Sequence, residues 1–276
     1  MLIFILFWLV LFGSAIGSFL NVVIYRFPAG LSLLFPPSHC PKCKHPIRWY
    51  DNVPVFGWLM LRGKCRDCGL PISARYPMIE AICGLIFGFV GFVFLYGRFP
   101  GGVPAADFES RLVLVACNSL LLTTLLAAGM IEFDRKKVPV KLFVPIIFFG
   151  ILICMEYRQQ HPMPFFQFDL RMIDNSKPPL WYANWGGGID AIVGAIAAVF
   201  FSCALFPVIR KEQRSGVVAA NIAAGLLFGW QLSLCAMLAM LVVLVLARFF
   251  AWRQLPGLTL LVFCTVWLMY NSTAWR

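Results

Sequence analysis

The chain has 276 residues, of which 61% are hydrophobic and only 13% are charged, and its mean hydropathy is +0.83. Soluble globular domains carry about a quarter charged residues, so this composition excludes that class and indicates a polytopic membrane protein. The net charge of +11 forms no basic stripe and no nucleic-acid-binding motif. We therefore expect the lipid bilayer, and no nucleic acid, as a partner.

The N-terminal residues predict a retained membrane helix rather than a cleaved signal peptide. Residues 1–10 contain no basic residue, and the apolar run continues to about residue 25 without a small-residue cleavage site. A helix needs about 20 apolar residues to cross the hydrocarbon core of a bilayer. Residues 1–25 are therefore expected to form the first transmembrane helix.

The remaining apolar stretches predict an all-α membrane helix bundle of about eight spans. The spans are expected near 2–25, 78–97, 111–131, 138–156, 188–209, 217–231, 233–250 and 256–271. The chain would then consist of the helix 1–25, a loop module over 26–77 and a helix bundle over 78–276. We identify no internal repeat in this sequence.

The distribution of basic residues predicts the orientation of these spans. If the loop 26–77 lies in the cytosol, seventeen of the 23 Lys and Arg residues fall on the cytosolic side. Short cytosolic loops of membrane proteins carry such an excess of Lys and Arg. The loop 26–77 is therefore expected to be a cytosolic module.

Two CxxC pairs lie in this loop and predict a metal site. They are Cys40-Pro-Lys-Cys43 and Cys65-Arg-Asp-Cys68, and 21 residues separate them. This spacing is close to that of tetrahedral zinc sites with four cysteine ligands. In a reducing cytosol, thiols at this spacing bind metal far more often than they form disulfides. We expect Cys40, Cys43, Cys65 and Cys68 to hold a structural Zn²⁺ in a zinc-ribbon-like module.

The segments on either side of the cysteines resemble a known family. Gly17-Ser-Phe-Leu-Asn-Val-Val-Ile-Tyr-Arg26 ends the first span, and Ile72-Ser-Ala-Arg-Tyr-Pro-Met-Ile-Glu80 follows the second CxxC pair. In this order, with the cysteines between them, they resemble the type IV prepilin leader peptidases, which are bifunctional prepilin peptidase/N-methyltransferases. The resemblance implies a bacterial inner (cytoplasmic) membrane aspartic endopeptidase of the GxGD type. It also implies prepilin or pseudopilin substrates of type IV pilus or type II secretion systems, and S-adenosylmethionine as a cofactor for N-methylation.

The chemistry of such a peptidase requires two carboxylates that share a water molecule. One carboxylate activates the water while the other, protonated, polarises the scissile carbonyl, and their closeness separates their pKa values. The first family motif resembles the stretch near 132–139. There Glu132 takes the place of the catalytic aspartate and Asp134 fills the second acidic position, while Val140 replaces a later aspartate.

The second family motif has two competing placements. One uses Gly186–Asp190 and retains an acidic residue, Asp190. The other uses 214–219 and is favoured by the downstream Gly225–Gln231, which resembles the family sequence; it puts Val217 at the aspartate position. The candidate catalytic residues are therefore Glu132, Asp134 and Asp190.

These placements leave two functions open. The chain is either a leader peptidase that uses Glu132 or Asp134 with Asp190, or a peptidase-inactive homologue. Such a homologue would bind or methylate prepilins, or act as a scaffold in the assembly. A transporter or channel is disfavoured, because Glu80, Glu132 and Asp134 lie at span ends rather than along an intramembrane ion pathway.

Overall fold

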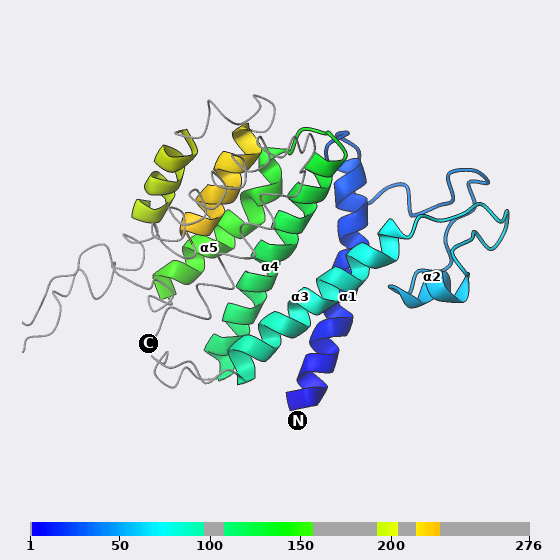
Figure 1. The fold of residues 1–276 in the computed structure, drawn as a ribbon, viewed down its shortest axis with the longest axis horizontal. Coiled ribbons are helices and arrows are strands. Elements are labelled where there is room, and N and C mark those ends of the chain that lie inside the picture. Colours follow the sequence, from blue (N-terminus) through cyan, green and yellow to red (C-terminus); the bar gives the residue numbers. More distant parts are fainter. Residues whose placement is uncertain (1, 97–107, 157–191, 204–213, 227–276) are drawn as a thin grey trace, which may run out of the picture. The chain divides into compact units, whose positions relative to one another are not determined.

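The computed structural model of the chain describes residues 2–96, 108–156, 192–203 and 214–226, and the regular elements in these ranges are helices (Figure 1). The long helices are α1 (Leu2–Arg26), α3 (Arg75–Tyr96), α4 (Phe108–Phe133) and α5 (Val144–Glu156). Two more helices cover 192–203 and 214–226. The short elements are α2 (Phe56–Met60) and the 3-10 helices η1 (Trp49–Asp51) and η2 (Val140–Phe143).

Three of the described helices are long and apolar enough to cross a membrane. They are Ile3–Arg26, Arg75–Leu95 and Arg111–Phe133. A lipid environment offers backbone N–H and C=O groups no partners, so a spanning segment satisfies them internally by forming a helix. The first three predicted spans are therefore confirmed, and the chain is a helical membrane protein.

The structure describes helices in some of the later predicted spans and leaves others outside the described residues. Shorter apolar helices, Val140–Ile151 and Ile192–Cys203, fall within the predicted spans 138–156 and 188–209. The helix 214–226 begins three residues before the predicted span 217–231. The predicted spans 233–250 and 256–271 lie outside the described residues, so the total of about eight spans stays a prediction.

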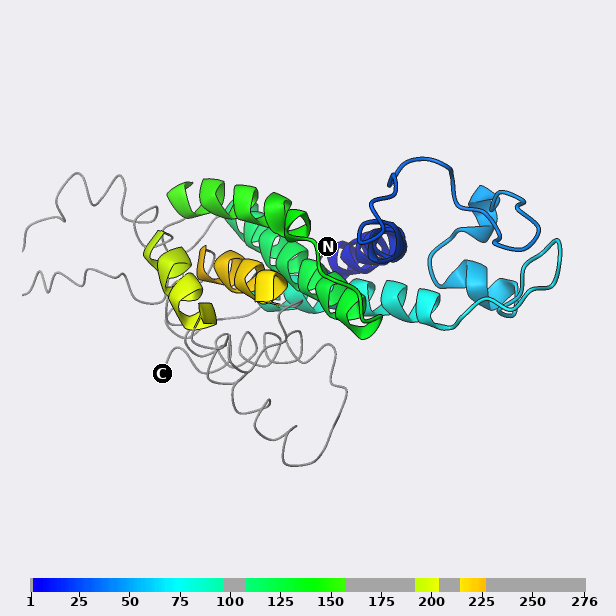
Figure 2. The same cartoon turned by 90° about the horizontal axis from the view of Figure 1, so that it is seen from above.

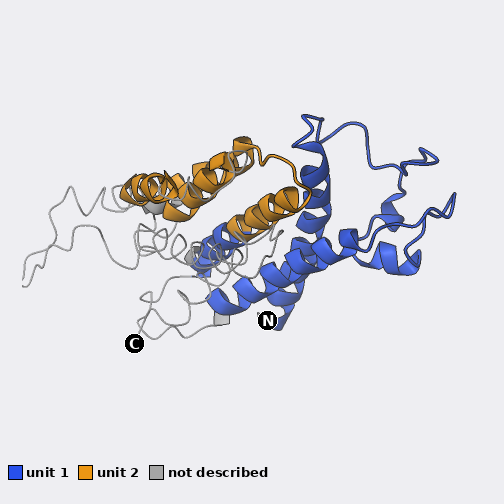
Figure 3. Ribbon diagram, turned by 45° about the horizontal axis from the view of Figure 1, so that its top comes forward, with its two compact units in different colours: residues 1–97, 107–119 blue, residues 98–106, 120–276 orange. Residues whose placement is uncertain are grey.

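The structure divides into two compact units (Figure 3). Unit 1 is Met1–Gly97 with Asp107–Ser119, and unit 2 is Arg98–Ala106 with Leu120–Arg276. In unit 2, Leu226 packs against Ile147, Ala195 and Ile222, so α5 and the two later helices share an apolar core. The division into 1–25, 26–77 and 78–276 that the sequence suggested stays a prediction.

Helices α1 and α3 of unit 1 pack in direct backbone contact, and Figures 1 and 2 show them crossing side by side. A Cβ atom added to Gly13 would lie 2.7 Å from the carbonyl oxygen of Cys83, and one added to Gly17 would lie 2.7 Å from the Cα atom of Glu80. Membrane helices associate through such small residues spaced four apart, since the hydrophobic effect does not draw them together within lipid. These glycines therefore set the α1–α3 distance.

We expect Gly17→Val to destabilise the α1–α3 pair by about 1–3 kcal/mol, because overpacking forces the backbones apart. The measurement is the stability of the full chain in micelles, followed through a denaturing-detergent titration. Ala15→Val is the matched control, because Ala15 lies on an exposed face of the same helix. Equal losses in the two variants would contradict the assignment of Gly17 to the helix contact.

Candidate metal centre

The loop between α1 and α3 contains two turns of the same design, one for each CxxC pair. In the first, the Cys40 N–H donates to the His45 carbonyl and the Lys44 N–H donates to the Cys40 carbonyl, both at 3.0 Å. In the second, the Cys65 N–H donates to the Leu70 carbonyl at 2.8 Å and the Gly69 N–H donates to the Cys65 carbonyl at 2.9 Å. Each turn is closed by a single β-bridge, His39 with Pro46 and Lys64 with Pro71.

This correspondence corrects the expectation that the sequence holds no internal repeat. The two turns share the pattern Cys-x-x-Cys-x-x-Pro, which begins at Cys40 and again at Cys65. The recurring proline was the signal that sequence reasoning missed. A structural repeat of two turns that face each other is the arrangement expected of a zinc-ribbon-like module.

The four cysteine sulfurs come together between the turns. The Sγ atoms of Cys40 and Cys68 are 3.7 Å apart, and those of Cys43 and Cys65 are 4.0 Å apart. All four sulfurs lie within 4.8 Å of one another. A tetrahedral zinc ion with Zn–S bonds of about 2.3 Å separates its sulfur ligands by about 3.8 Å. The four sulfurs therefore lie close to the spacing that such an ion requires.

The ionisation of these thiols also fits a cation between them. Hydrogen bonds from the backbone N–H of Cys43, and then of Lys42, lower the pKa of the Cys40 thiol to about 6. The N–H of His45 lowers the pKa of the Cys43 thiol, but burial and hydrogen bonds with the three other thiols raise it to about 11. Four thiolates this close repel one another, and a bound divalent cation removes that repulsion.

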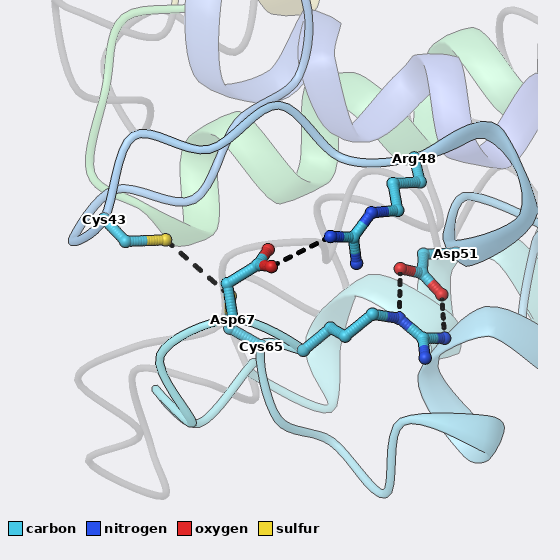
Figure 4. Close-up of polar contacts among 6 residues, drawn as sticks. Cys43, Arg48, Asp51, Cys65 and Asp67 are labelled. Atoms are coloured by element: carbon cyan, nitrogen blue, oxygen red, sulfur yellow. Dashed lines mark hydrogen bonds and ion pairs between the residues drawn. The ribbon is translucent and has the colours of Figure 1, made fainter.

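The spacer residues of the second CxxC pair attach it to the chain that follows the first pair (Figure 4). Arg66 donates from Nε to Oδ2 of Asp51 at 2.8 Å and from Nη2 to Oδ1, and its guanidinium lies over the Tyr50 ring, 5.4 Å from the centroid. Its neighbour Asp67 accepts a hydrogen bond from Arg48 at 3.0 Å. The Arg66 hydrogen bond, opposed by burial and aided by charge attraction, lowers the pKa of Asp51. Sequence reasoning counted Arg66 among the basic residues of the loop but predicted neither of these contacts.

A second set of contacts joins the module to α3. The backbone N–H of Val55 donates to Oε2 of Glu80 at 2.7 Å. Val55 has φ of +63°, a region that a β-branched residue seldom occupies. Within the module, the Trp58 indole N–H donates to the Ile72 carbonyl at 2.9 Å. Glu80 is the last residue of the motif after the second CxxC pair, so that motif includes the carboxylate that holds the module against α3.

The candidate catalytic carboxylates lie at the C-terminal end of α4. Glu132 is in the last turn of α4 and is 8% exposed, and Asp134 follows the end of that helix, with its N–H donating to the Met130 carbonyl at 3.1 Å. Asp190 lies outside the described residues, so the structure does not test the pairing of Asp190 with either of them.

The two segments that resemble the family motifs meet in unit 2. A Cβ atom added to Gly216 would lie 3.0 Å from the Cβ atom of Val138. Val138 and Val217 are buried, with exposed fractions of 1% and 3%. The stretches near 132–139 and 214–219 are therefore neighbours in space, although about 80 residues separate them along the chain.

The fifth residue of each cysteine turn adopts a left-handed conformation, with φ of +59° at Lys44 and +70° at Gly69. A side chain in this conformation costs roughly 1–2 kcal/mol. Lys44→Gly is therefore expected to stabilise the module by up to about 1 kcal/mol. Gly69→Ala is expected to destabilise it by a similar amount, through the backbone alone, because no atom lies within 4 Å of the added methyl group.

Hydrogen exchange at the amides of the two turns, in the full chain, measures both effects. Lys42→Gly is the matched control for Lys44→Gly, because Lys42 is a neighbouring exposed lysine with an ordinary φ. The control should speed exchange, whereas Lys44→Gly should slow it. Faster exchange in both glycine variants would contradict the strain assigned to Lys44.

The N-terminal part of the chain matches a known protein family model. A family model described as Bacterial Peptidase A24 N-terminal domain matches residues 11–94, which include the four cysteines and most of α1 and α3. No solved structure matches the chain.

Several curated proteins named Prepilin leader peptidase/N-methyltransferase are similar to it. The Myxococcus xanthus protein is 40% identical over 148 residues, covering 53% of this chain and 39% of that protein. The Klebsiella pneumoniae protein is 38% identical over 151 residues, covering 52% and 60%, and the Stutzerimonas stutzeri protein is 37% identical over 165 residues, covering 51% and 52%. The chain thus spans about half the length of the curated relatives it matches. Over this shared part, the chain is similar to the prepilin leader peptidases.

Proposed function

We propose that this chain is an integral membrane protein that acts on type IV prepilins or pseudopilins and cleaves their leader peptides. The observation that carries the proposal is the sequence identity of 37–40% between this chain and proteins named Prepilin leader peptidase/N-methyltransferase. The match of residues 11–94 to a peptidase N-terminal domain supports the same function. Cleavage would take place at the bacterial inner membrane. The cysteine-bearing loop would lie in the cytosol, as the distribution of basic residues indicates.

We assign Glu132 or Asp134 to the catalytic centre, with Asp190 as the partner carboxylate. One of the two would take a proton from a water molecule, while the other would hold a proton toward the scissile carbonyl. Glu132 lies buried at a helix end, and the 132–139 stretch lies beside the 214–219 stretch through Val138 and Gly216. This convergence supports a site built from both segments.

The four cysteines are proposed to hold a structural Zn²⁺. Their sulfurs lie within 4.8 Å of one another, and four thiolate ligands leave no open coordination position for catalysis. When bound, the ion would cross-link the two turns and supply folding free energy to the module. S-adenosylmethionine is proposed as the methyl donor, on the strength of the N-methyltransferase activity in the names of the relatives.

The alternative function is a peptidase-inactive homologue that binds or methylates prepilins or scaffolds the assembly. The observation that favours it is Val217, which stands at the aspartate position in one placement of the second motif and is buried. The similarity to named leader peptidases favours the active enzyme. A single cleavage assay separates the two.

In that assay, the full chain in liposomes is incubated with a prepilin, and mass spectrometry measures leader removal. We expect cleavage, and we expect Glu132→Gln to slow it by about a hundredfold or more, because general acid–base groups contribute factors of this size. Glu109→Gln is the matched control, since Glu109 lies in the first turn of the same helix, and it should cleave normally. An uncleaved prepilin alongside an active homologue would establish the alternative, and unchanged cleavage in Glu132→Gln would remove Glu132 from the site.

Metal analysis of the purified full chain should find about one zinc ion per chain. Cys65→Ser should abolish it, because three thiolates hold a structural zinc ion far less tightly than four. Cys203→Ser is the control, since Cys203 is exposed in the helix 192–203 and should leave the zinc content unchanged. In Cys65→Ser, the rate of amide hydrogen exchange should rise over residues 27–74 and should not rise over α1 or α3. A zinc-free wild-type chain with a protected loop would contradict the metal site.

A further inference from the structure

Helix α2 of the cysteine module presents an exposed apolar face. Phe56, Leu59 and Met60 are 57%, 55% and 75% exposed. Positions i, i+3 and i+4 of a helix share one face, so the three side chains form a single surface patch, named here the α2 face. None of the contacts described above for the metal site involves this patch.

The rest of α2 fixes the direction of this face. A Cβ atom on Gly57 would collide with the carbonyl oxygen of Asp51, so the Gly57 side of the helix lies directly on the module backbone. Trp58 is tied through its indole N–H to the Ile72 carbonyl, and its ring covers Gly63. The helix therefore has no room to rotate and bury the α2 face within the module.

Two basic residues follow the α2 face directly. Arg62 and Lys64 are both exposed, and neither is in an ion pair among the described residues. The acidic residues of the segment 27–74 are Asp51 and Asp67, and each is already paired, with Arg66 and Arg48. The surface next to the α2 face is therefore positively charged, and its surplus of cations complements an anionic partner.

The module is also held close to the bilayer at both of its ends. It begins where the spanning helix α1 ends, at Arg26, and it ends where the spanning helix α3 begins, at Arg75. Asn21 of α1 donates to the Tyr76 carbonyl of α3 at 3.2 Å, so the two attachment points are neighbours. In Figure 1, α2 lies on the lower side of the module, the side toward which the N-terminal end of α1 runs.

We propose that the α2 face docks on the surface of an anionic phospholipid bilayer. Phe56, Leu59 and Met60 would enter the boundary between headgroups and acyl chains, and Arg62 and Lys64 would lie against lipid phosphates. Apolar side chains next to Lys and Arg are the pattern of segments that lie in a membrane interface. The module would then be held against the membrane by α2, in addition to its covalent links to α1 and α3.

The size of the patch favours lipid over a protein partner. A stable protein interface uses about 20–30 residues on each side, whereas the α2 face has three apolar side chains. For a segment already tethered at both ends, docking on the bilayer is an intramolecular step with a high effective concentration. A small patch therefore suffices for lipid and not for a freely diffusing protein.

The test is photocrosslinking of the zinc-loaded full chain in liposomes. A photoreactive phenylalanine replaces Met60 in one variant and the exposed Lys42 in the matched control. In bilayers of phosphatidylethanolamine with phosphatidylglycerol, we expect lipid adducts at position 60 and few at position 42. Adducts at position 60 with a peptide of this chain, with a second copy or with no molecule would overturn the proposal.

Two further variants test the charge and the apolar side chains separately. In Arg62→Gln/Lys64→Gln the ratio of docked to undocked module should fall roughly thirtyfold, which corresponds to about 1 kcal/mol for each cation near an anionic surface. Replacing phosphatidylglycerol by phosphatidylcholine should lower the adduct yield of the wild type in the same way. Leu59→Ser should also lower the yield at position 60 while the zinc content stays at the wild-type value. If neither the loss of the two cations nor the loss of anionic lipid changes the adduct yield at position 60, the proposed role of Arg62 and Lys64 is wrong.

Discussion

The close approach of α1 and α3 is the constraint on which the rest of unit 1 depends. Gly13 and Gly17 allow the two backbones to meet, and the Asn21–Tyr76 hydrogen bond keeps the C-terminal end of α1 beside the N-terminal end of α3. The residues 27–74 therefore leave the helix pair and return to nearly the same place. The helix contact brings the loop ends together, so the loop itself has less closure entropy to overcome.

The folded loop has very little apolar core to stabilise it. Among residues 27–74, only Cys40, Gly57 and Gly63 are buried, and two of these have no side chain. Segments this small usually need a metal or disulfides to remain folded. Here the structure supplies four converging sulfurs, the Asp51–Arg66 and Arg48–Asp67 ion pairs and the Val55–Glu80 hydrogen bond. Ion pairs that involve solvent-exposed arginines, as these two do, contribute little each, so a metal ion bound by the four sulfurs would be the main source of stability that this arrangement allows.

The features that sequence alone predicted are those that depend on local patterns. The CxxC spacing brought four ligands into one site, and apolar runs located α1, α3 and α4, because a single helix satisfies its own backbone wherever the run is long enough. The span near 138–156 was less well predicted, since its first turn is the 3-10 helix η2 after Pro139. The ion partners of Arg66 and Arg48, and the docking of Val55 on Glu80, were not predictable. These contacts depend on how two turns and a helix are arranged in space, and local sequence patterns do not predict such an arrangement.

The position of Glu132 is the strongest structural argument for chemistry at the end of α4. The C-terminal end of a helix carries a partial negative charge, and burial adds a desolvation penalty, so both effects act against a carboxylate there. Arg135, Lys136 and Lys137 follow at once and offset part of this penalty. The segment continues to Val138, which packs on Gly216. Since the neighbour of Gly216 is the apolar Val217, the 214–219 segment offers no carboxylate of its own, and the proposed enzyme would draw its second acid from Asp190.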